Sequence, residues 1–326
     1  LMKKTVWFIA CLIFVGSCSK KSTPYLPQSN GNINTITVVI PNNLWESSVG
    51  ETIRSIFAMP AEGLPQQEPM FDLKQMPPEV FSGFAQSSRL VLWIGVYSEE
   101  TFRMDTNRYA SPQRMGVMTS KTQERLIQNI QNHASELISE FKDVEIKEKQ
   151  RRVSKSLKKN IGTKHGLSIH LKMPSVYSTF KEAPGIVWYQ KEIQKGSLNI
   201  LAYELPNAKI DYSKKLLAQI IAIRDSIGQS FIPGRSEGSY VITEAAYEPY
   251  IYKSSIAGFS AIETRGTWEV KSDFMAGPFL NYVIRDTLNK RQLVLEGFVF
   301  APSLAKRDYI FEVDAILQSV QIDLKE

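Results

Sequence analysis

The chain has 326 residues, of which 43% are apolar and 22% are charged, and its formal net charge is +6. This is the composition of an ordinary globular protein, and it excludes a wholly disordered chain, a collagen-like repeat and a polytopic membrane protein. The length allows about two domains, each large enough to bury its own core.

The first eighteen residues have the pattern of an export signal. Lys3 and Lys4 precede an apolar run at 6–15, which is too short to cross a bilayer core of ~30 Å as a helix. The run ends in Val-Gly-Ser-Cys at 15–18, which resembles the lipobox of bacterial lipoproteins. We therefore expect a lipoprotein signal peptide over 1–18 that is cut before Cys18, whose thiol then carries lipid. The alternatives are a plain secretory signal and a short anchor with an incidental cysteine.

The second cysteine, Cys11, lies inside the segment that we expect to be removed. The mature chain would then have no free thiol, which excludes disulfides, thiolate metal ligands and a cysteine nucleophile. Residues 19–34 are polar, broken by proline and without periodicity, so they are expected to form a flexible tether.

The residues after Cys18 carry sorting information by their resemblance to other lipoproteins. Ser19 occupies the position at which an inner-membrane retention signal has aspartate, which favours the outer membrane. Lys20 and Lys21 are basic where surface-exported lipoproteins carry acidic residues. We therefore expect an anchor in the periplasmic leaflet of the outer membrane.

The first lobe is expected over 35–160 and begins with alternating strands and helices. The β-branched run at 35–40 predicts a buried strand, and the capping-box pair Ser48 and Glu51 predicts a helix that continues to about Met59. Next come a loop at 63–69 and two strands, at 70–75 and 89–97, with a short helix between them.

The longest predicted helix opens at the capping-box pair Ser120 and Gln123. Its apolar residues, at 127, 130, 134, 137, 141 and 144, are three or four apart, so one face is buried. The stripe is too short to require a second chain, so we favour a helix packed on its own core over a coiled-coil dimer. The segment 160–166, with two glycines, is the predicted domain boundary.

The second lobe, 161–326, is expected to be rich in strands. Strands are predicted at 167–173, 186–193, 198–205, 240–243, 250–255, 258–270, 279–285 and 292–300, and helices near 176–180, 211–227 and 306–320. The fold class is therefore α+β, with two lobes that each pack helices on a largely antiparallel or mixed sheet. The similar runs at 89–92 and 292–295 leave open that the lobes are duplicated.

No complete catalytic motif is present. His165 and His170 would point to opposite faces of a strand and His133 lies on a helix face, so we expect no metal site and no cofactor. The one catalytic alternative is a hydrolase that uses paired carboxylates in a cleft between the lobes. The candidates for such a pair are Glu68, Asp72, Glu263, Asp273 and Glu296.

Residues 266–303 concentrate aromatic residues, glycines and prolines at the ends of strands. A less favoured hypothesis is that the loops between these strands line a groove in which Trp268, Phe274, Phe279 and Arg285 meet a ligand. The competing interpretation is that the aromatic residues fill the core and the glycines and prolines end strands.

Positive charge concentrates in one segment, 142–159, where eight basic residues face three acidic ones. The candidate basic patch comprises Arg151, Arg152, Lys155, Lys158 and Lys159. Such a patch would bind an anionic envelope polymer, but we favour the alternative that it is a solvated helix end. Without Lys3 and Lys4 the net charge is about +4, which is too small to suggest a nucleic-acid partner.

Several segments resemble a lipoprotein family of the Bacteroidetes known as domain of unknown function number 4837. The front half carries the likeness at 38–46 and 63–71, and the rear half carries it at 275–279 and 297–302, so it spans essentially the mature chain. The resemblance implies location and lineage but no activity, cofactor or catalytic residue. We therefore expect a non-catalytic envelope lipoprotein, anchored through Cys18, that binds a partner protein or a glycan.

Overall fold

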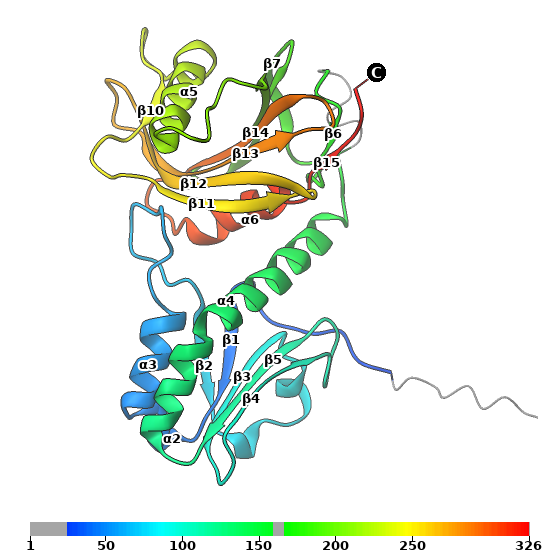
Figure 1. The fold of residues 1–326 in the computed structure, drawn as a ribbon, viewed down its shortest axis with the longest axis vertical. Helices are drawn as coiled ribbons and strands as arrows, with labels where there is room; N and C mark the ends of the chain where they lie inside the picture. The colour runs from blue at the N-terminus through cyan, green and yellow to red at the C-terminus, as the bar shows by residue number, and fades with distance from the viewer. Residues whose placement is uncertain (1–24, 159–165, 326) are drawn as a thin grey trace, which may run out of the picture.

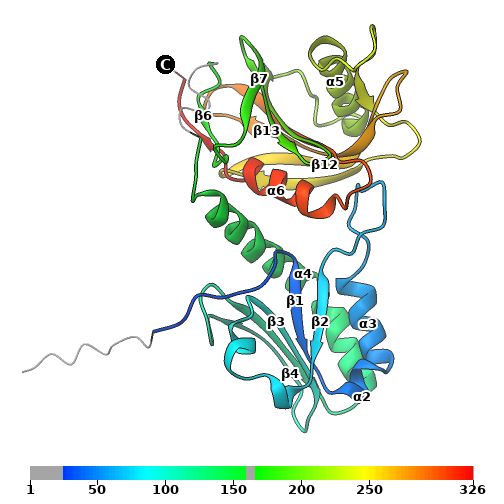
Figure 2. The ribbon, with the colours of Figure 1, turned by 180° about the vertical axis from the view of Figure 1, so that it is seen from behind.

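The computed structural model describes residues 25–158 and 166–325, which form two lobes joined by the long helix α4 (Gln123–Val153) (Figure 1). Figures 1 and 2 show the lobes stacked along the long axis of the molecule, with α4 running from the first lobe to the second. The fold class is α+β with two lobes, as the sequence predicts. Lys159 lies outside the described residues.

The first lobe is a five-stranded mixed sheet in the order β2-β1-β3-β5-β4. Its strands are parallel except for β4, which runs antiparallel to β5 at one edge. Their bounds are β1 Thr35–Val39, β2 Asp72–Met76, β3 Leu90–Val96, β4 Thr101–Thr106 and β5 Arg114–Ser120. Both faces of a parallel sheet need cover, which explains why β1 is buried along its whole length.

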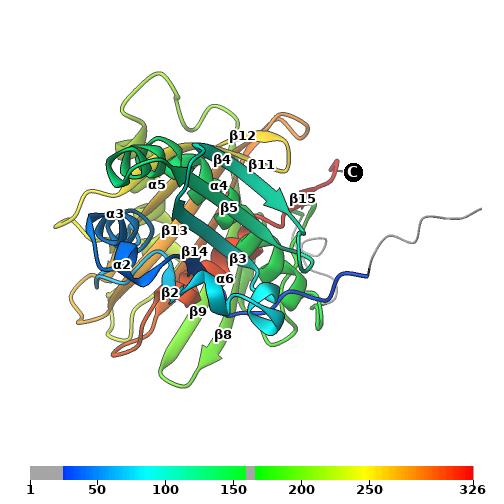
Figure 3. The same cartoon turned by 90° about the horizontal axis from the view of Figure 1, so that it is seen from below.

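Helices cover the two faces of this sheet unequally. The larger core lies beneath α4 and α3 (Ser48–Phe57) and includes Phe57, Leu137 and Phe141. The short α2 (Asn42–Trp45) precedes α3. The opposite face is covered by two 3-10 turns, η1 (Pro78–Val80) and η2 (Gly83–Ser87), next to Phe81. Seen from below, the strands of this lobe run side by side, with α2 and α3 at one edge (Figure 3).

The second lobe is an eight-stranded sheet in which every pair of neighbouring strands is antiparallel. The order is β10-β12-β13-β14-β9-β8-β7, and β11 also pairs with β12. The bounds are β7 Ser178–Ala183, β8 Ile186–Ile193, β9 Gly196–Pro206, β10 Val241–Thr243, β11 Tyr250–Ile256, β12 Phe259–Val270, β13 Ala276–Asp286 and β14 Arg291–Phe300. A separate small pair joins β6 (Ile169–His170) to β15 (Gln321–Ile322).

A helix covers each face of the large sheet. Helix α6 (Arg307–Leu317) packs on one face, and α5 (Leu216–Phe231) packs on the other. Gly297 permits the close approach of α6, because a Cβ there would lie 1.8 Å from Cγ1 of Val313. We call the two surfaces of the sheet the α6 face and the α5 face.

The idea of duplicated lobes is wrong, since one sheet is mostly parallel and the other is antiparallel. The short helix expected near 176–180 is also wrong, because Ser178–Ala183 is the edge strand β7. Strands β4 and β5 were not predicted. The side chain that caps α4 belongs to Thr122 rather than Ser120, which ends β5.

The expected tether is shorter than 19–34, because its last residues pack on the first lobe. The backbone N–H groups of Ser29 and Asn30 donate to the carbonyl groups of Ser111 and Ser87 at 3.1 and 2.8 Å. Asn34 is buried, and its N–H donates to Glu145 at 2.8 Å. These hydrogen bonds fix the segment before β1 against the sheet and α4.

A buried ion pair connects this segment, the start of β3 and α4. Arg89 Nε lies 2.6 Å from Glu145 Oε1, and both side chains are almost fully buried. Arg89 also donates to the carbonyl groups of Gly31 and Asn32. Burial raises the pKa of Glu145 above its usual range, although the hydrogen bond from Arg89 opposes this. The carboxylate therefore depends on its partner.

The substitution Arg89→Ala should destabilise the protein by about 3 to 5 kcal/mol, because it leaves Glu145 buried without its partner. The control is Arg103→Ala, whose pair with Asp105 is largely solvated, and it should cost less than about 1 kcal/mol. Urea unfolding followed by circular dichroism measures both free energies. Equal small losses of the free energy of unfolding in the two variants would contradict the role of Arg89 as the partner of Glu145.

Candidate functional site

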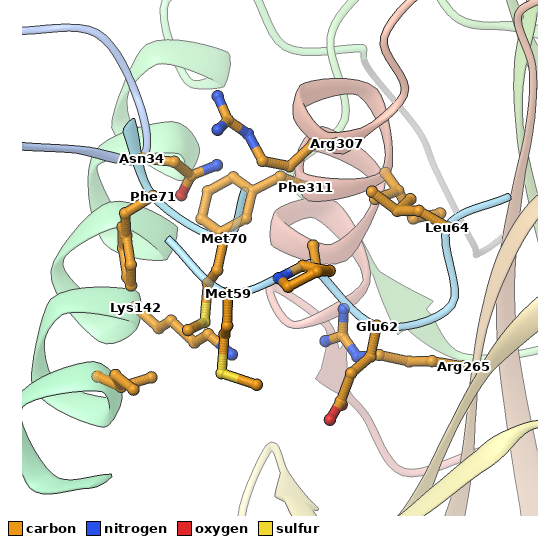
Figure 4. Close-up of a pocket in the computed structure, with 14 residues that line it drawn as sticks. Asn34, Met59, Glu62, Leu64, Met70, Phe71, Lys142, Arg265, Arg307 and Phe311 are labelled. Carbon is orange, nitrogen blue, oxygen red and sulfur yellow. The ribbon is translucent and has the colours of Figure 1, made fainter. Parts of the chain in front are cut away.

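A cavity of about 200 Å³ lies between the lobes (Figure 4). Its walls come from α4, α6, strand β12 and the loop that leads into β2. We call this loop, residues 59–71, the inter-lobe arm. Pockets at domain junctions are common ligand sites, because two surfaces can enclose a small molecule there.

The inter-lobe arm starts in the first lobe and docks on the second. The hydroxyl of Tyr252 donates to Glu62 at 2.6 Å, and Leu64 packs against the core of the second lobe. Gly63 has a φ of +76°, and a Cβ there would lie about 3 Å from the backbone of Gly266. Glycine therefore suits both the conformation and the contact. The sequence predicts this loop but not its docking.

The end of the inter-lobe arm caps helix α6. The carboxylate of Glu68 accepts the backbone N–H groups of Lys306 and Arg307 at 2.7 and 2.9 Å. A carboxylate at a helix N-terminus satisfies free N–H groups and interacts favourably with the helix dipole. The arm therefore fixes the position of α6 on one side of the cavity.

The walls of the cavity are mainly apolar. Met59 and Met70 come from the inter-lobe arm, Ile138 comes from α4, and Ile310 and Phe311 come from α6. Figure 4 shows the two methionines and Phe311 around the same space. Methionine side chains are flexible and polarisable, so such walls adapt to the shape of an apolar ligand.

Three cations line the cavity, and two of them are held by carboxylates. Arg265 is paired with Glu263 and with Asp314, whose Oδ2 lies 2.8 Å from Nη2. Arg307 lies 2.8 Å from Asp72 and 2.9 Å from Asp308. These pairs neutralise much of the charge of both guanidinium groups and fix their positions.

The third cation, Lys142, has no hydrogen bond or ion pair within the described parts of the chain. It lies one helical turn beyond Ile138 on α4 and extends toward Met59 (Figure 4). Desolvation and the nearby guanidinium of Arg265 lower the pKa of Lys142. An ammonium group in such surroundings gains from an anionic partner. The sequence predicts Lys142 only as part of a basic segment, although its spacing from Ile138 places it on the side of α4 that lines the cavity.

The predicted carboxylate pair is not assembled in this cavity. Its lining contains one carboxylate, that of Glu62. The five candidates have other partners: Glu68 caps α6, Asp72 and Glu263 pair with arginines, Asp273 accepts the N–H of Phe274, and Glu296 pairs with Arg224. In the described ranges, no three His, Cys, Asp or Glu side chains gather in a way that could hold a metal ion.

The four residues expected in one groove do not meet. Trp268 and Phe279 are buried on the α5 face, whereas Phe274 is fully exposed in the loop between β12 and β13. Arg285 lies near the far end of β13, with its guanidinium 6.0 Å from the ring of Tyr212. Phe279 and Arg285 are six residues apart on β13, so the length of the strand separates them. Trp268 lines the groove that is described below.

The candidate basic patch is not one free helical face. Helix α4 ends at Val153, so Lys155 and Lys158 follow it, and Lys159 lies outside the described residues. Arg151 and Arg152 both bind the buried carboxylate of Glu148 at 2.7 Å. Arg152 also donates to the carbonyl of Gly31 at 2.9 Å. Both arginines therefore have structural partners.

Comparison with known proteins places the chain in a family. A model described as domain of unknown function (DUF4837) matches residues 154–319, about half of the chain. The chain belongs to this family. A second model, domain of unknown function (DUF8532), matches residues 29–154. The expected likeness to DUF4837 over the whole mature chain is therefore corrected, because the front lobe matches a family model of its own.

No curated protein matches the chain. One similar solved structure is a STAR-related lipid transfer protein (fragment 25–204) from Xanthomonas axonopodis, at 13% identity. The match covers 44% of this chain and 96% of that one, with a TM-score of 0.22, which is too low to support an argument. Within residues 25–158 and 166–325, no helix of this DUF4837 protein has the length and apolar character needed to span a membrane.

The stability of this DUF4837 protein should fall in acid because of Glu148. Burial alone would raise the pKa of Glu148, but hydrogen bonds from Arg151 and Arg152 and the charge of Arg89 lower it from 4.5 to about 2. A lowered pKa means that the stabilisation is complete above pH ~4.5 and is lost as the pH falls toward 2.

The variant Glu148→Gln should lose on the order of 3 kcal/mol at pH 7, since each pKa unit corresponds to about 1.4 kcal/mol. The difference in the free energy of unfolding between this variant and the parent protein should decrease as the pH falls from 4.5 to 2. Urea unfolding across this pH range measures it, with Glu100→Gln, an exposed partner of Arg125, as the control. A difference in the free energy of unfolding that stays constant from pH 7 to pH 2 would contradict the lowered pKa of Glu148.

Proposed function

We propose that this protein is a lipid-anchored, non-catalytic binding module of the cell envelope whose inter-lobe cavity binds a small amphipathic anion. One observation carries the proposal: Lys142 is an unpaired cation in a cavity with mainly apolar walls. The absence of a complete catalytic motif from the sequence supports a binding role.

The cavity offers a favourable contact to the apolar body of such a ligand and another to its anionic group. Apolar walls of methionine, isoleucine and phenylalanine favour burial of an apolar body, with about 25 cal/mol gained per Å² removed from water. The ammonium group of Lys142 favours a carboxylate or phosphate at the other end. Such a charge-assisted contact is stronger than a neutral hydrogen bond.

The anchor would keep both lobes close to the membrane surface. The sequence pattern at 15–18 supports lipidation of Cys18, and the described chain is already fixed to the first lobe by Gln28 and Ser29. The ten residue steps from Cys18 to Gln28 span at most about 35 Å, at ~3.5 Å per residue. A protein tethered this closely to a bilayer is well placed to meet amphipathic molecules.

Binding can be tested with octanoate, 1-octanol and octylammonium, using the full chain with Cys18→Ala and titration calorimetry. Octanoate should bind most tightly, and Lys142→Met should weaken it at least about tenfold, or ~1.4 kcal/mol, with little effect on octanol. Lys142→Arg should retain binding. Because the pKa of Lys142 is lowered, octanoate affinity should fall with rising pH earlier than for an ordinary lysine.

The matched control is Lys147→Met, which removes an exposed lysine from the same helix. It should leave octanoate binding unchanged. Equal affinity for octanoate and octanol, or an unchanged affinity in Lys142→Met, would refute the assignment of this cavity.

Anchoring is tested separately by expressing the unmodified chain and Cys18→Ala in a Gram-negative host. The unmodified chain should fractionate with the outer membrane and incorporate labelled palmitate, because several acyl chains hold a protein firmly in a bilayer. The Cys18→Ala variant should incorporate none and be released from the membrane. Label retained in Cys18→Ala would disprove lipidation at this residue.

A further inference from the structure

We propose that the part of the α5 face left uncovered by α5 is a saccharide-binding groove. This site is independent of the inter-lobe cavity. It is a cavity of about 460 Å³ bounded by β7, β8, β9, β12, β14 and the segment that follows α5. Its size falls within the range of small-molecule sites.

Strand register places the lining residues on one face of the sheet. Gln190, Asn199, Phe298 and Phe279 are successive cross-strand partners from β8 to β13. The neighbouring row contains Glu192, Ser197 and Phe300. Cross-strand partners project to the same side of a sheet, so both rows face the groove side.

Aromatic rings form the floor and one wall of the groove. Trp268 and Phe298 are buried, with ring centroids 5.5 Å apart, and Trp188 lies 6.0 Å from Phe298. The ring of Phe180 lies 4.4 Å from that of Trp188 and is 55% exposed. Phe180 therefore presents an open aromatic surface above a buried aromatic layer, at the edge strand β7.

Some polar groups around these rings have their orientation fixed by hydrogen bonds, and others can still form hydrogen bonds with a ligand. The buried Asn199 accepts the indole N–H of Trp188 at 3.0 Å and the amide of Gln190 at 3.1 Å. These bonds leave Oε1 of Gln190 free to accept a hydrogen bond. Glu192 and Arg235 have no ion pair or hydrogen bond in the described ranges, although Arg235 lies 5.6 Å from the ring of Phe300.

The next row along the sheet contains buried polar atoms without partners. Thr264, Asn281 and Glu296 are cross-strand neighbours beneath Arg224 of α5. Oγ1 of Thr264, Oδ1 of Asn281 and Nη2 of Arg224 have no hydrogen-bond partner among the described residues, and all three residues are more than nine-tenths buried. Such groups are rare in native proteins, where buried polar atoms usually have partners. This row begins two residues, or about 7 Å, beyond the Phe298 row.

The exposed ring of Phe180 and the free polar groups that line the groove fit a sugar ring better than other small ligands. A sugar has an apolar C–H face that stacks on aromatic rings, and hydroxyl groups that both donate and accept hydrogen bonds. The groove offers free acceptors in Gln190 and Glu192 and a free donor in Arg235. Glu192 and Arg235 carry opposite charges, so the groove has no preference for a charged ligand. We therefore assign it to a neutral saccharide chain.

The test uses the full chain with Cys18→Ala and three hexasaccharides: β-1,4-linked N-acetylglucosamine, β-1,4-linked glucose and α-1,4-linked glucose. Titration calorimetry should find at least one that binds with a Kd below about 1 mM, and the identity of that sugar distinguishes amino-sugar polymers from glucans. Failure of all three to bind would overturn the proposal.

Variants then locate the binding site. Phe180→Ala removes an exposed ring and should weaken binding at least about tenfold, while Phe274→Ala, an exposed aromatic outside the groove, should have no effect. Glu192→Gln and Arg235→Gln change polar groups without changing the core, and each should weaken binding at least about threefold. Lys142→Met should leave it unchanged, which separates this site from the inter-lobe cavity. Binding that survives Phe180→Ala, Glu192→Gln and Arg235→Gln would place the sugar elsewhere and overturn the proposal.

Discussion

The arrangement of the lobes depends on the buried guanidinium of Arg89. Burying a charge is costly unless every partner is in place, and here Glu145, Gly31 and Asn32 supply those partners from two separate segments. Only one position of α4 against β3 satisfies all of these contacts. The same helix continues beyond the first lobe, where Lys149 lies 2.9 Å from Glu312 of α6. The helix that carries Glu145 is therefore also in contact with α6 of the second lobe.

The inter-lobe cavity follows from this placement. Helix α4 bounds it on one side, and the inter-lobe arm, fixed by Glu62 and Glu68, bounds it on the other. Most polar groups at the margins are engaged in holding the lobes together, so the walls that remain are apolar. Lys142 is different because Glu263 and Asp314 already pair with Arg265, and Glu62 accepts the hydroxyl of Tyr252. Among the described residues, Lys142 therefore lacks the carboxylate partner that both cavity-lining arginines have.

The sequence predicts the periodic elements well and the junction poorly. The stripe from Ile130 to Val144 repeats every three or four residues, so the long helix follows from local information alone. Strand β7 is exposed along its whole length and has no apolar alternation, which explains why it was mistaken for a helix. The cavity could not be predicted, because Glu62 and its partner Tyr252 are 190 residues apart. Trp268 was identified as a groove residue, but its neighbours in the groove come from strands that only the sheet order brings together.

The two faces of the large sheet differ in how completely they are packed. On the α6 face, Gly297 allows Val313 to approach the strand backbone, so the helix and the sheet are in close contact at this point. On the α5 face, the helix covers one end, where Thr264, Asn281 and Arg224 carry buried polar atoms without partners among the described residues, and the other end is the aromatic groove. Each buried polar atom without a partner costs about 1 to 3 kcal/mol. The covered end therefore keeps polar groups where an apolar row would be more stable, whereas the uncovered end keeps an exposed aromatic ring beside polar side chains, which is the composition of a surface shaped for binding.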